Sequence, residues 1–336
     1  MNEKHSIEER CRKILEDNGG VVANKARTML LEDPALKDLR YPLEFISKNW
    51  LDLTPALISL SCEAVGGRPE KTHDVALAMC LMHLSFYIWD DVIDNARSKS
   101  FRPTLFGKFG GGTALIIGGL ASAKAFSILN EMPMGRKRQR VSKLIWNLGV
   151  KMAQVETITL KLRSKENLSS KRKFWKIKTE AADLETCLKI GAIIGNGSKS
   201  EESHLEKYGL YLGIALELSK DFRISVNLTA ELAEKIKNGT LPYSTLWASQ
   251  RSQRIQKKLH DLAGEGVIKQ ACIKEIVQDT LATKVLDHIT KNITRYTQKA
   301  KNELIHLKKN NATQTLKSFV DFQPRLFTES LSMFQV

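Results

Sequence analysis

The sequence has few cysteines, and none of the spacings that cysteine-based sites require. Its five cysteines are an odd number, and no two of them form a CxxC pair. This argues against a disulfide framework and against a zinc-finger site. The residues after Met1 lack the apolar core of a secretory signal. Together these absences predict a reduced, cytoplasmic chain.

The chain also lacks alternating strand patterns, internal repeats and any linker long or biased enough to separate domains. Its 42% apolar content is ample for a continuous core. We therefore expect one all-α domain over residues 1–336, because a large helical bundle can absorb that length. Helices are expected at about residues 54–65, 72–94, 113–131, 136–164, 171–194, 201–226, from 243 onward, and 267–308.

No hydrophobic run is long enough to be a convincing membrane span. Residues 75–89 come closest, but they fall short of the roughly 20 residues required. They also contain His83 and Ser85 and lead directly into two aspartates. Because residues 72–94 are hydrophobic on all sides, the pattern predicts a core helix surrounded by other helices.

Basic residues exceed acidic residues by 52 to 37, which gives a net charge of +15. Such an excess favours an anionic partner: nucleic acid, an acidic membrane surface or a phosphorylated substrate. A lysine-rich, solvated surface is the alternative interpretation. The basic runs are not interleaved with aromatics, and no helix-turn-helix or zinc-finger spacing occurs, which argues against nucleic acid. Peripheral membrane contact and a phosphorylated substrate both stay open.

Three aspartates, Asp90, Asp91 and Asp94, end the apolar helix. Asp90 and Asp94 are one helical turn apart on the same face, and Asp91 lies about 100° round the axis. Crowded carboxylates repel one another unless cations neutralise them, and hard oxygen ligands suit Mg²⁺. An acidic helix end exposed to water is the alternative. The apolar helix before the aspartates and the basic segment from Arg97 to Arg102 favour a magnesium site.

Residues 82–94 (MHLSFYIWDDVID), followed by residues 101–104 (FRPT) and a glycine-rich turn, resemble the trans-isoprenyl diphosphate synthase (polyprenyl synthetase) family. Similar segments follow in order at Lys178-Thr179, residues 211–215 and residues 238–242, so the resemblance covers about residues 40–320. It implies an isoprenoid synthase-type bundle around a deep central cavity, a homodimer, Mg²⁺ and an allylic prenyl diphosphate substrate. It also implies that Lys178 and Thr179 contact the diphosphate.

The chain departs from this family where elongating members bind isopentenyl diphosphate. Their basic GGKRxRP segment corresponds here to residues 49–55, which read NWLDLTP and have lost the cations. Their paired arginines after the first aspartates correspond to Lys99 and Ser100. By this resemblance Lys99 keeps the charge that serves the allylic diphosphate, whereas Ser100 cannot serve the acceptor.

The second aspartate motif is also altered, because residues 220–224 read KDFRI where the family has DDxxD. Asp221, Ser225 and Thr229 nevertheless share one helical face. Their spacing resembles the N-xxx-S-xxx-E metal motif of class I terpene synthases and predicts a second magnesium site. A polar stripe on a partly exposed helix is the alternative. Arg223 is a further candidate for contact with the diphosphate.

An apolar cavity is expected beside the aspartates, because the carbocation left by a departing diphosphate must be shielded from water. Ser85, Phe86 and Trp89 are the candidate lining residues. In relatives, bulky residues four and five positions before the first aspartate limit chain length. Small Ser85 beside Phe86 therefore predicts room for a C15 to C25 chain.

Three functions are compatible with these patterns. Loss of the acceptor site with retention of the ionisation site favours a class I terpene synthase-like enzyme, which would release a cyclic or linear terpene and diphosphate. The alternative is a trans-prenyltransferase or polyprenyl diphosphate synthase with an altered acceptor site. The third is a non-catalytic partner subunit of a prenyl synthase; the intact DDVID argues against it, and the eroded second motif argues for it.

Overall fold

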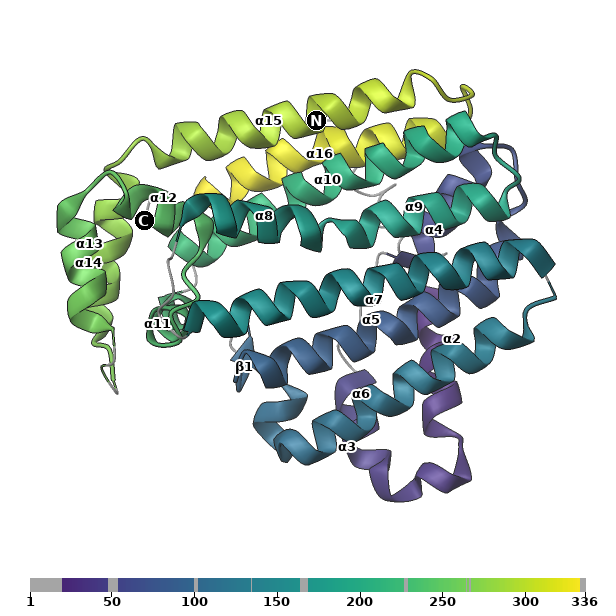
Figure 1. The fold of residues 1–336 in the computed structure, drawn as a ribbon, viewed down its shortest axis with the longest axis horizontal. Coiled ribbons are helices and arrows are strands. Elements are labelled where there is room, and N and C mark those ends of the chain that lie inside the picture. The colour runs from purple at the N-terminus through teal and green to yellow at the C-terminus, as the bar shows by residue number, and fades with distance from the viewer. Residues whose placement is uncertain are drawn as a thin grey trace.

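The computed structural model describes residues 20–47, 54–99, 102–133, 135–163, 169–226, 229–263, 265 and 267–332. Over these residues the chain is helical apart from turns and one short hairpin, in which β1 (Ser98–Lys99) pairs antiparallel with β2 (Arg102–Pro103). The prediction of an all-α fold is confirmed. In Figure 1 the longest helices run roughly along the long axis of the molecule, and two short ones lie across one end.

The helices of the first half of the chain supply the aspartate cluster and its surroundings. They are α2 (Val21–Leu31), η2 (Pro34–Leu39), α3 (Arg40–Ser47), α4 (Thr54–Ala64), η3 (Pro69–Thr72), α5 (His73–Ile93), α6 (Leu105–Glu131) and α7 (Gly135–Arg163).

The helices of the second half close the bundle on the other side. They are α8 (Ser170–Glu180), α9 (Ala182–Ile194), α10 (Lys199–Val226), α11 (Thr229–Lys237), α12 (Tyr243–Ser249), α13 (Gln253–Leu262), α14 (Gln270–Leu281), α15 (Val285–Leu304) and α16 (Asn311–Ser332).

Helix α5 is the buried core helix that its composition predicts. Every side chain in residues 75–85 is buried, and the helix packs against α4, α6 and α7. By length and composition α5 and α6 are each apolar enough to cross a membrane. For α5 the surrounding helices account for that composition, whereas α6 keeps apolar side chains such as Ile116 exposed.

Helix α10 joins two hydrophobic cores. Its first half, including Leu205 and Tyr208, packs into the core built around α5. Its second half, including Leu218 and Phe222, packs into the core formed with α11 to α15. The polar side chains in the second half of α10 are therefore held in a fixed orientation between the two cores.

Helices α5 and α6 approach closely at one glycine. A Cβ atom built on Gly118 would lie 2.5 Å from Nε1 of Trp89. Only glycine leaves room for the indole ring there, and this contact fixes the ring of Trp89 one residue before the aspartates.

Three helix boundaries differ from those expected. The helix expected over residues 171–194 is divided at Ala181 into α8 and α9, and the one expected over 267–308 is divided into α14 and α15. Helix α6 begins at Leu105 rather than at residue 113, since the glycine-rich segment is incorporated around a kink at Gly110 (φ 83°). Glycine tolerates this backbone conformation, so the glycine run does not end the helix.

Candidate active site

The three predicted aspartates lie together where α5 ends. Asp94 is the C-cap residue, and its amide donates to the carbonyl of Asp90. Asp91 and Asp94 are buried. The carbonyl end of a helix carries partial negative charge, so three carboxylates there are unfavourable without nearby cations.

Two lysines from distant segments supply that charge. The Lys99 ammonium in β1 lies 2.6 Å from Oδ2 of Asp90 and 2.6 Å from Oδ1 of Asp91. The Lys235 ammonium in α11 lies 2.7 Å from Oδ2 of Asp94. Lys99 thus lies beside the first aspartates, as the sequence predicts, whereas sequence spacing gives no sign of Lys235.

The lysines determine how the three carboxyls titrate. Burial alone would raise the pKa of Asp90, but Lys99 and other nearby ammonium groups outweigh it and hold that pKa below its usual range. Burial is likewise outweighed at Asp94, mainly by Lys235, so its pKa is also lowered. At Asp91 burial prevails over Lys99 and the pKa is raised. Asp90 and Asp94 are therefore ionised at neutral pH.

Glu156 on α7 completes a group of three carboxylates that sequence reasoning missed. One ligand oxygen from each of Asp90, Asp94 and Glu156 lies within 4.8 Å of the others. In the described part of the chain, Oε2 of Glu156 is buried without a hydrogen-bond partner. Burial, aided by the charges of Asp90 and Asp94, raises the pKa of Glu156 to about 7. Hard oxygens from two helices, one of them unpaired, fit a divalent cation.

Lys176 is an α8 lysine near this cluster that sequence reasoning missed. Lys176 is buried, donates to Oγ1 of Thr159 at 2.8 Å and lies 3.5 Å from Oε1 of Glu180. The side chain of Lys178 is exposed. Thr179 donates to a carbonyl of its own helix and Arg223 is exposed, and their contact with a diphosphate stays a prediction.

Asp221 and Ser225 are engaged with α12 rather than with the carboxylate group. Asp221 accepts the amides of Tyr243 and Ser244 at 3.0 and 3.2 Å and the Ser244 hydroxyl at 3.1 Å. The Ser225 hydroxyl lies 2.6 Å from that of Ser244. Pro242 gives the N-terminus of α12 no side-chain cap, so Asp221 satisfies the amides that begin the helix. The side chain of Thr229, and residues 49–53 and 100, lie outside the described part of the chain.

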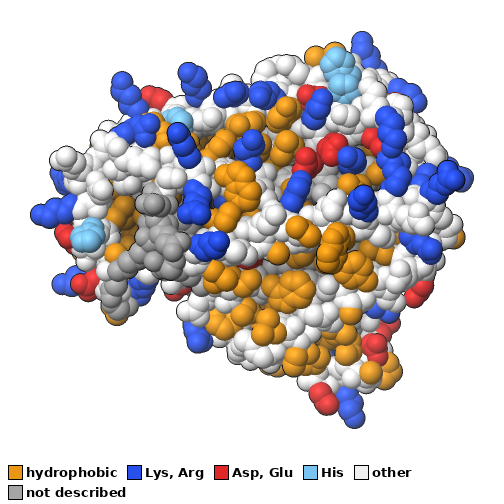
Figure 2. Space-filling model, viewed as in Figure 1, with side chains coloured by type: hydrophobic (Ala, Val, Ile, Leu, Met, Phe, Trp, Pro, Cys, Tyr) orange, Lys and Arg blue, Asp and Glu red, His pale blue; other side chains and the backbone are white. Residues whose placement is uncertain are grey.

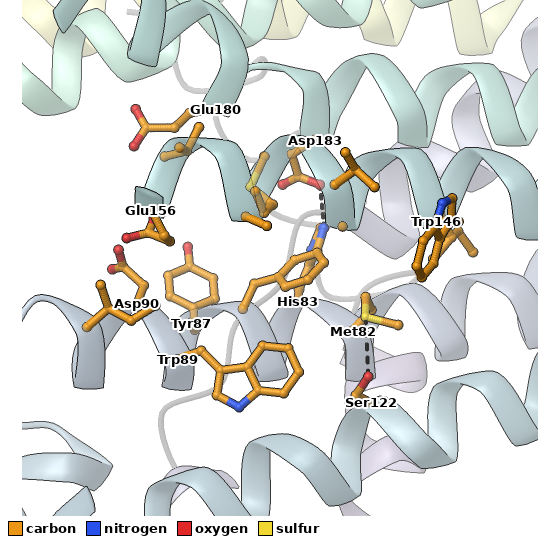
Figure 3. A pocket seen from close by; sticks show the side chains of 18 of the residues that line it. Met82, His83, Tyr87, Trp89, Asp90, Ser122, Trp146, Glu156, Glu180 and Asp183 are labelled. Carbon is orange, nitrogen blue, oxygen red and sulfur yellow. Dashed lines mark hydrogen bonds and ion pairs between the residues drawn. The ribbon is translucent and has the colours of Figure 1, made fainter. Parts of the chain in front are cut away.

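A cavity of about 660 Å³ extends from the carboxylates into the bundle. Figure 3 shows Asp90 and Glu156 at one end and Met82, Ser122 and Trp146 toward the other. The predicted lining residues Phe86 and Trp89 do line it. Ser85 does not, because its side chain is turned toward α6, where it donates to the Gly118 carbonyl at 2.8 Å. Met82 and Phe86, one turn apart on α5, thus line the cavity, and Ser85 does not.

A buried hydrogen-bonded chain lies in the wall of this cavity. Nε2 of His83 pairs with Asp183 of α9, and Nδ1 lies 2.7 Å from Oγ1 of Thr54. His83 and Asp183 both face the cavity (Figure 3). Thr54 belongs to the segment, residues 49–55, that corresponds to the basic acceptor segment, so a residue of that segment holds from behind an imidazole that lines the cavity.

Comparison with known proteins shows the family and the fold of this chain. The Polyprenyl synthetase family model matches residues 47–280. This chain belongs to the polyprenyl synthetase family. Among its relatives, a short chain isoprenyl diphosphate synthase of Methanothermobacter thermautotrophicus is 26% identical over 298 residues, which cover 84% of this chain and 89% of that protein. A geranylfarnesyl diphosphate synthase of Methanosarcina mazei is 25% identical over 273 residues, covering 79% of this chain and 89% of that protein.

The fold of this polyprenyl synthetase family member is also found among solved structures. The crystal structure of a geranylgeranyl pyrophosphate synthetase from Pyrococcus horikoshii superposes with a TM-score of 0.82 at 21% identity. The match covers 94% of this chain and 98% of the other. It confirms the predicted isoprenoid synthase-type bundle.

Proposed function

We propose that this protein is a magnesium-dependent prenyltransferase of the prenyl diphosphate synthase type. The observation that carries this proposal is the group of Asp90, Asp94 and Glu156, with its unpaired oxygen, at the head of an apolar cavity. A site for the metal ion that would bind the diphosphate and space for a prenyl chain are adjacent there. The named relatives, which are isoprenyl and geranylfarnesyl diphosphate synthases, support the same reaction type.

The carboxylates and the lysines of the site would have separate roles. Bound at Asp90, Asp94 and Glu156, Mg²⁺ would neutralise negative charge on the leaving diphosphate. Lys99 and Lys235, which pair with the aspartates, would then be free to turn toward diphosphate oxygens.

The cavity wall serves the other part of the substrate. Phe86 and Trp89 line the cavity close to the aspartates, where their ring faces would stabilise an allylic cation. The apolar depth beyond them excludes water and accommodates the prenyl chain.

The acceptor in this proposal is isopentenyl diphosphate, bound at an altered site. Ser100 stands where the family has an arginine, so one charge-assisted contact is lost, worth about 1.5–3 kcal/mol. We therefore expect a high KM for isopentenyl diphosphate. The terpene synthase hypothesis receives no support from the relatives, which are diphosphate synthases by name, and the partner-subunit hypothesis does not require the unpaired carboxylate of Glu156.

The test is a magnesium titration of diphosphate release from an allylic prenyl diphosphate in the presence of isopentenyl diphosphate. Asp90→Asn should abolish release, and Glu156→Gln should raise the magnesium concentration needed by at least tenfold. Asp74→Asn is the matched control, because Asp74 lies on the exposed first turn of the same helix. If Asp90→Asn and Asp74→Asn behave alike, the carboxylates have no role in the reaction and the proposal is wrong.

We further propose that a second copy of the chain covers the exposed apolar face of α6 and α7. Leu115, Ile116, Trp146 and Val150 are 41–65% exposed there, and all but Ile116 also line the cavity. Figure 2 shows hydrophobic side chains gathered over this region. Sedimentation should give a dimer for the wild type and a monomer for Trp146→Glu. A wild type that sediments as a monomer would contradict this.

A further inference from the structure

Helix α10 directs a lysine, Lys220, into the cavity that begins at the aspartates. Lys220 and Glu217 both line this cavity, and the Lys220 ammonium lies 3.4 Å from Oε2 of Glu217. The Lys220 side chain is 56% exposed and that of Glu217 is 26% exposed. The ammonium is thus accessible to a molecule in the cavity.

The orientation of α10 gives Lys220 this position. Asp221, the next residue, is turned about 100° round the helix and is buried against the start of α12. The segment that stands in place of the second aspartate motif therefore directs the Lys220 ammonium toward the cavity. Its one carboxylate, that of Asp221, caps α12 instead. Among the described residues, the carboxylates close enough to share one ion near the aspartates come from α5 and α7, and none comes from α10.

Lys220 and Asp90 line the same cavity. The Glu217 carboxylate raises the pKa of Lys220 above its usual range, and Tyr87, Glu180 and Asp90 add to this effect. The ammonium is charged throughout the neutral range. Three other lysines are held by closer partners: Lys99 and Lys235 by the aspartates, and Lys176 by Thr159.

We propose that Lys220 binds the diphosphate of the allylic substrate and supplies from α10 the positive charge that a second metal cluster would otherwise provide. This inference rests on the proposed prenyltransferase function. As the allylic carbon–oxygen bond breaks, its electron pair stays on the diphosphate oxygen. Lys220 keeps its proton and donates a hydrogen bond to the leaving group, so no proton is transferred. The site would then bind fewer magnesium ions than one with carboxylates on both sides.

Binding of inorganic diphosphate without metal tests Lys220 directly. Calorimetry in EDTA should show that Lys220→Ala and Lys220→Met weaken binding at least tenfold relative to the wild type, whereas Lys220→Arg retains most of it. Lys207→Ala, an exposed position on the same helix, should bind like the wild type. Thermal melts of each variant show whether it is folded. Equal affinity of wild type and Lys220→Ala for diphosphate would overturn the proposal.

The number of bound magnesium ions gives a second, independent readout. With inorganic diphosphate present, Lys220→Asp should bind at least one more Mg²⁺ per chain than the wild type. An unchanged stoichiometry in folded Lys220→Asp would contradict the inference. If the Lys220 variants behave like the wild type while magnesium binding still depends on Asp90, the inference about Lys220 is wrong and the proposed function stands. If the wild type binds no magnesium with diphosphate, both are wrong.

Discussion

Lys235 and Asp94 form an ion pair, with 2.7 Å between Nζ and Oδ2, although 141 residues separate them in the chain. Asp94 is 6% exposed and the Lys235 side chain 21% exposed, so the pair is screened only weakly by water. The lysine neutralises a carboxylate that would otherwise repel Asp90 and Asp91. Lys235 thus balances charge at the site where Mg²⁺ would bind.

Removing this lysine should lower the stability of the protein in EDTA and increase the stabilisation that magnesium with diphosphate provides. We expect Lys235→Met to lower the free energy of unfolding in EDTA by about 1–3 kcal/mol, because a buried carboxylate loses its partner. Magnesium with diphosphate should restore more stability to the variant than to the wild type. Urea unfolding with and without metal measures both effects. Lys237→Met, exposed on the same helix, is the control, and equal losses in the two variants would rule out the pair.

Asp221 should behave as a helix cap and not as a metal ligand. Asp221→Asn weakens three hydrogen bonds to α12 and leaves the partly buried Lys173, 4.0 Å from Oδ1, without its carboxylate. We expect a loss of about 1–3 kcal/mol in the free energy of unfolding, with the magnesium requirement unchanged. The matched control is Asp261→Asn on the surface. A variant of wild-type stability that needs more magnesium would instead support the second metal site expected from the sequence.

His288 should make stability depend on pH through its contact with α12. Its Nε2 lies 2.8 Å from the Tyr243 hydroxyl. Burial and the charges of Arg251 and Lys291 lower the pKa of His288 from 6.5. The unfolded chain then binds a proton that the folded one resists, so this stabilisation is complete above about pH 6.5 and is lost as the pH falls through the folded pKa.

Melting temperatures of the wild type and His288→Gln measure this effect. The difference between them should narrow as the pH falls from about 8 to about 5. His260→Gln, exposed on α13, should follow the wild type at every pH. A constant difference between wild type and His288→Gln would show that the imidazole contributes only packing.

The length of the prenyl product should depend on the side chain of Met82 and not on that of Ser85. Met82 lines the cavity one turn beyond Phe86, whereas Ser85 donates to the Gly118 carbonyl of α6. Met82→Ala removes side-chain volume from the wall and should shift the product toward a longer prenyl chain. Ser85→Ala should leave product length unchanged. Mass spectrometry of the products checks both, and a length shift with Ser85→Ala alone would contradict the observed orientation.

The sequence predicts the features that depend on the spacing of residues along a single helix. One helical turn determines that Asp90 and Asp94 share a face, and an all-round apolar run predicts the burial of α5. Glu156, Lys176 and Lys235 are not predictable in this way, because separate helices bring them to the aspartates. The prediction that Ser85 lines the cavity is wrong, because the side chains four and five positions before Asp90 point about 100° apart round the helix. Only the packing of α6 decides which of them faces inward.

The most direct measurement of the central claim is product analysis with defined substrates. The protein is incubated with Mg²⁺ and geranyl, farnesyl, geranylgeranyl or geranylfarnesyl diphosphate, with and without isopentenyl diphosphate, and products are identified by mass spectrometry beside Asp90→Asn and Asp74→Asn. We predict a longer prenyl diphosphate and free diphosphate only when isopentenyl diphosphate and magnesium are both present, from the wild type and Asp74→Asn but not from Asp90→Asn. A hydrocarbon or alcohol formed without isopentenyl diphosphate, or no reaction in any mixture, would contradict the account.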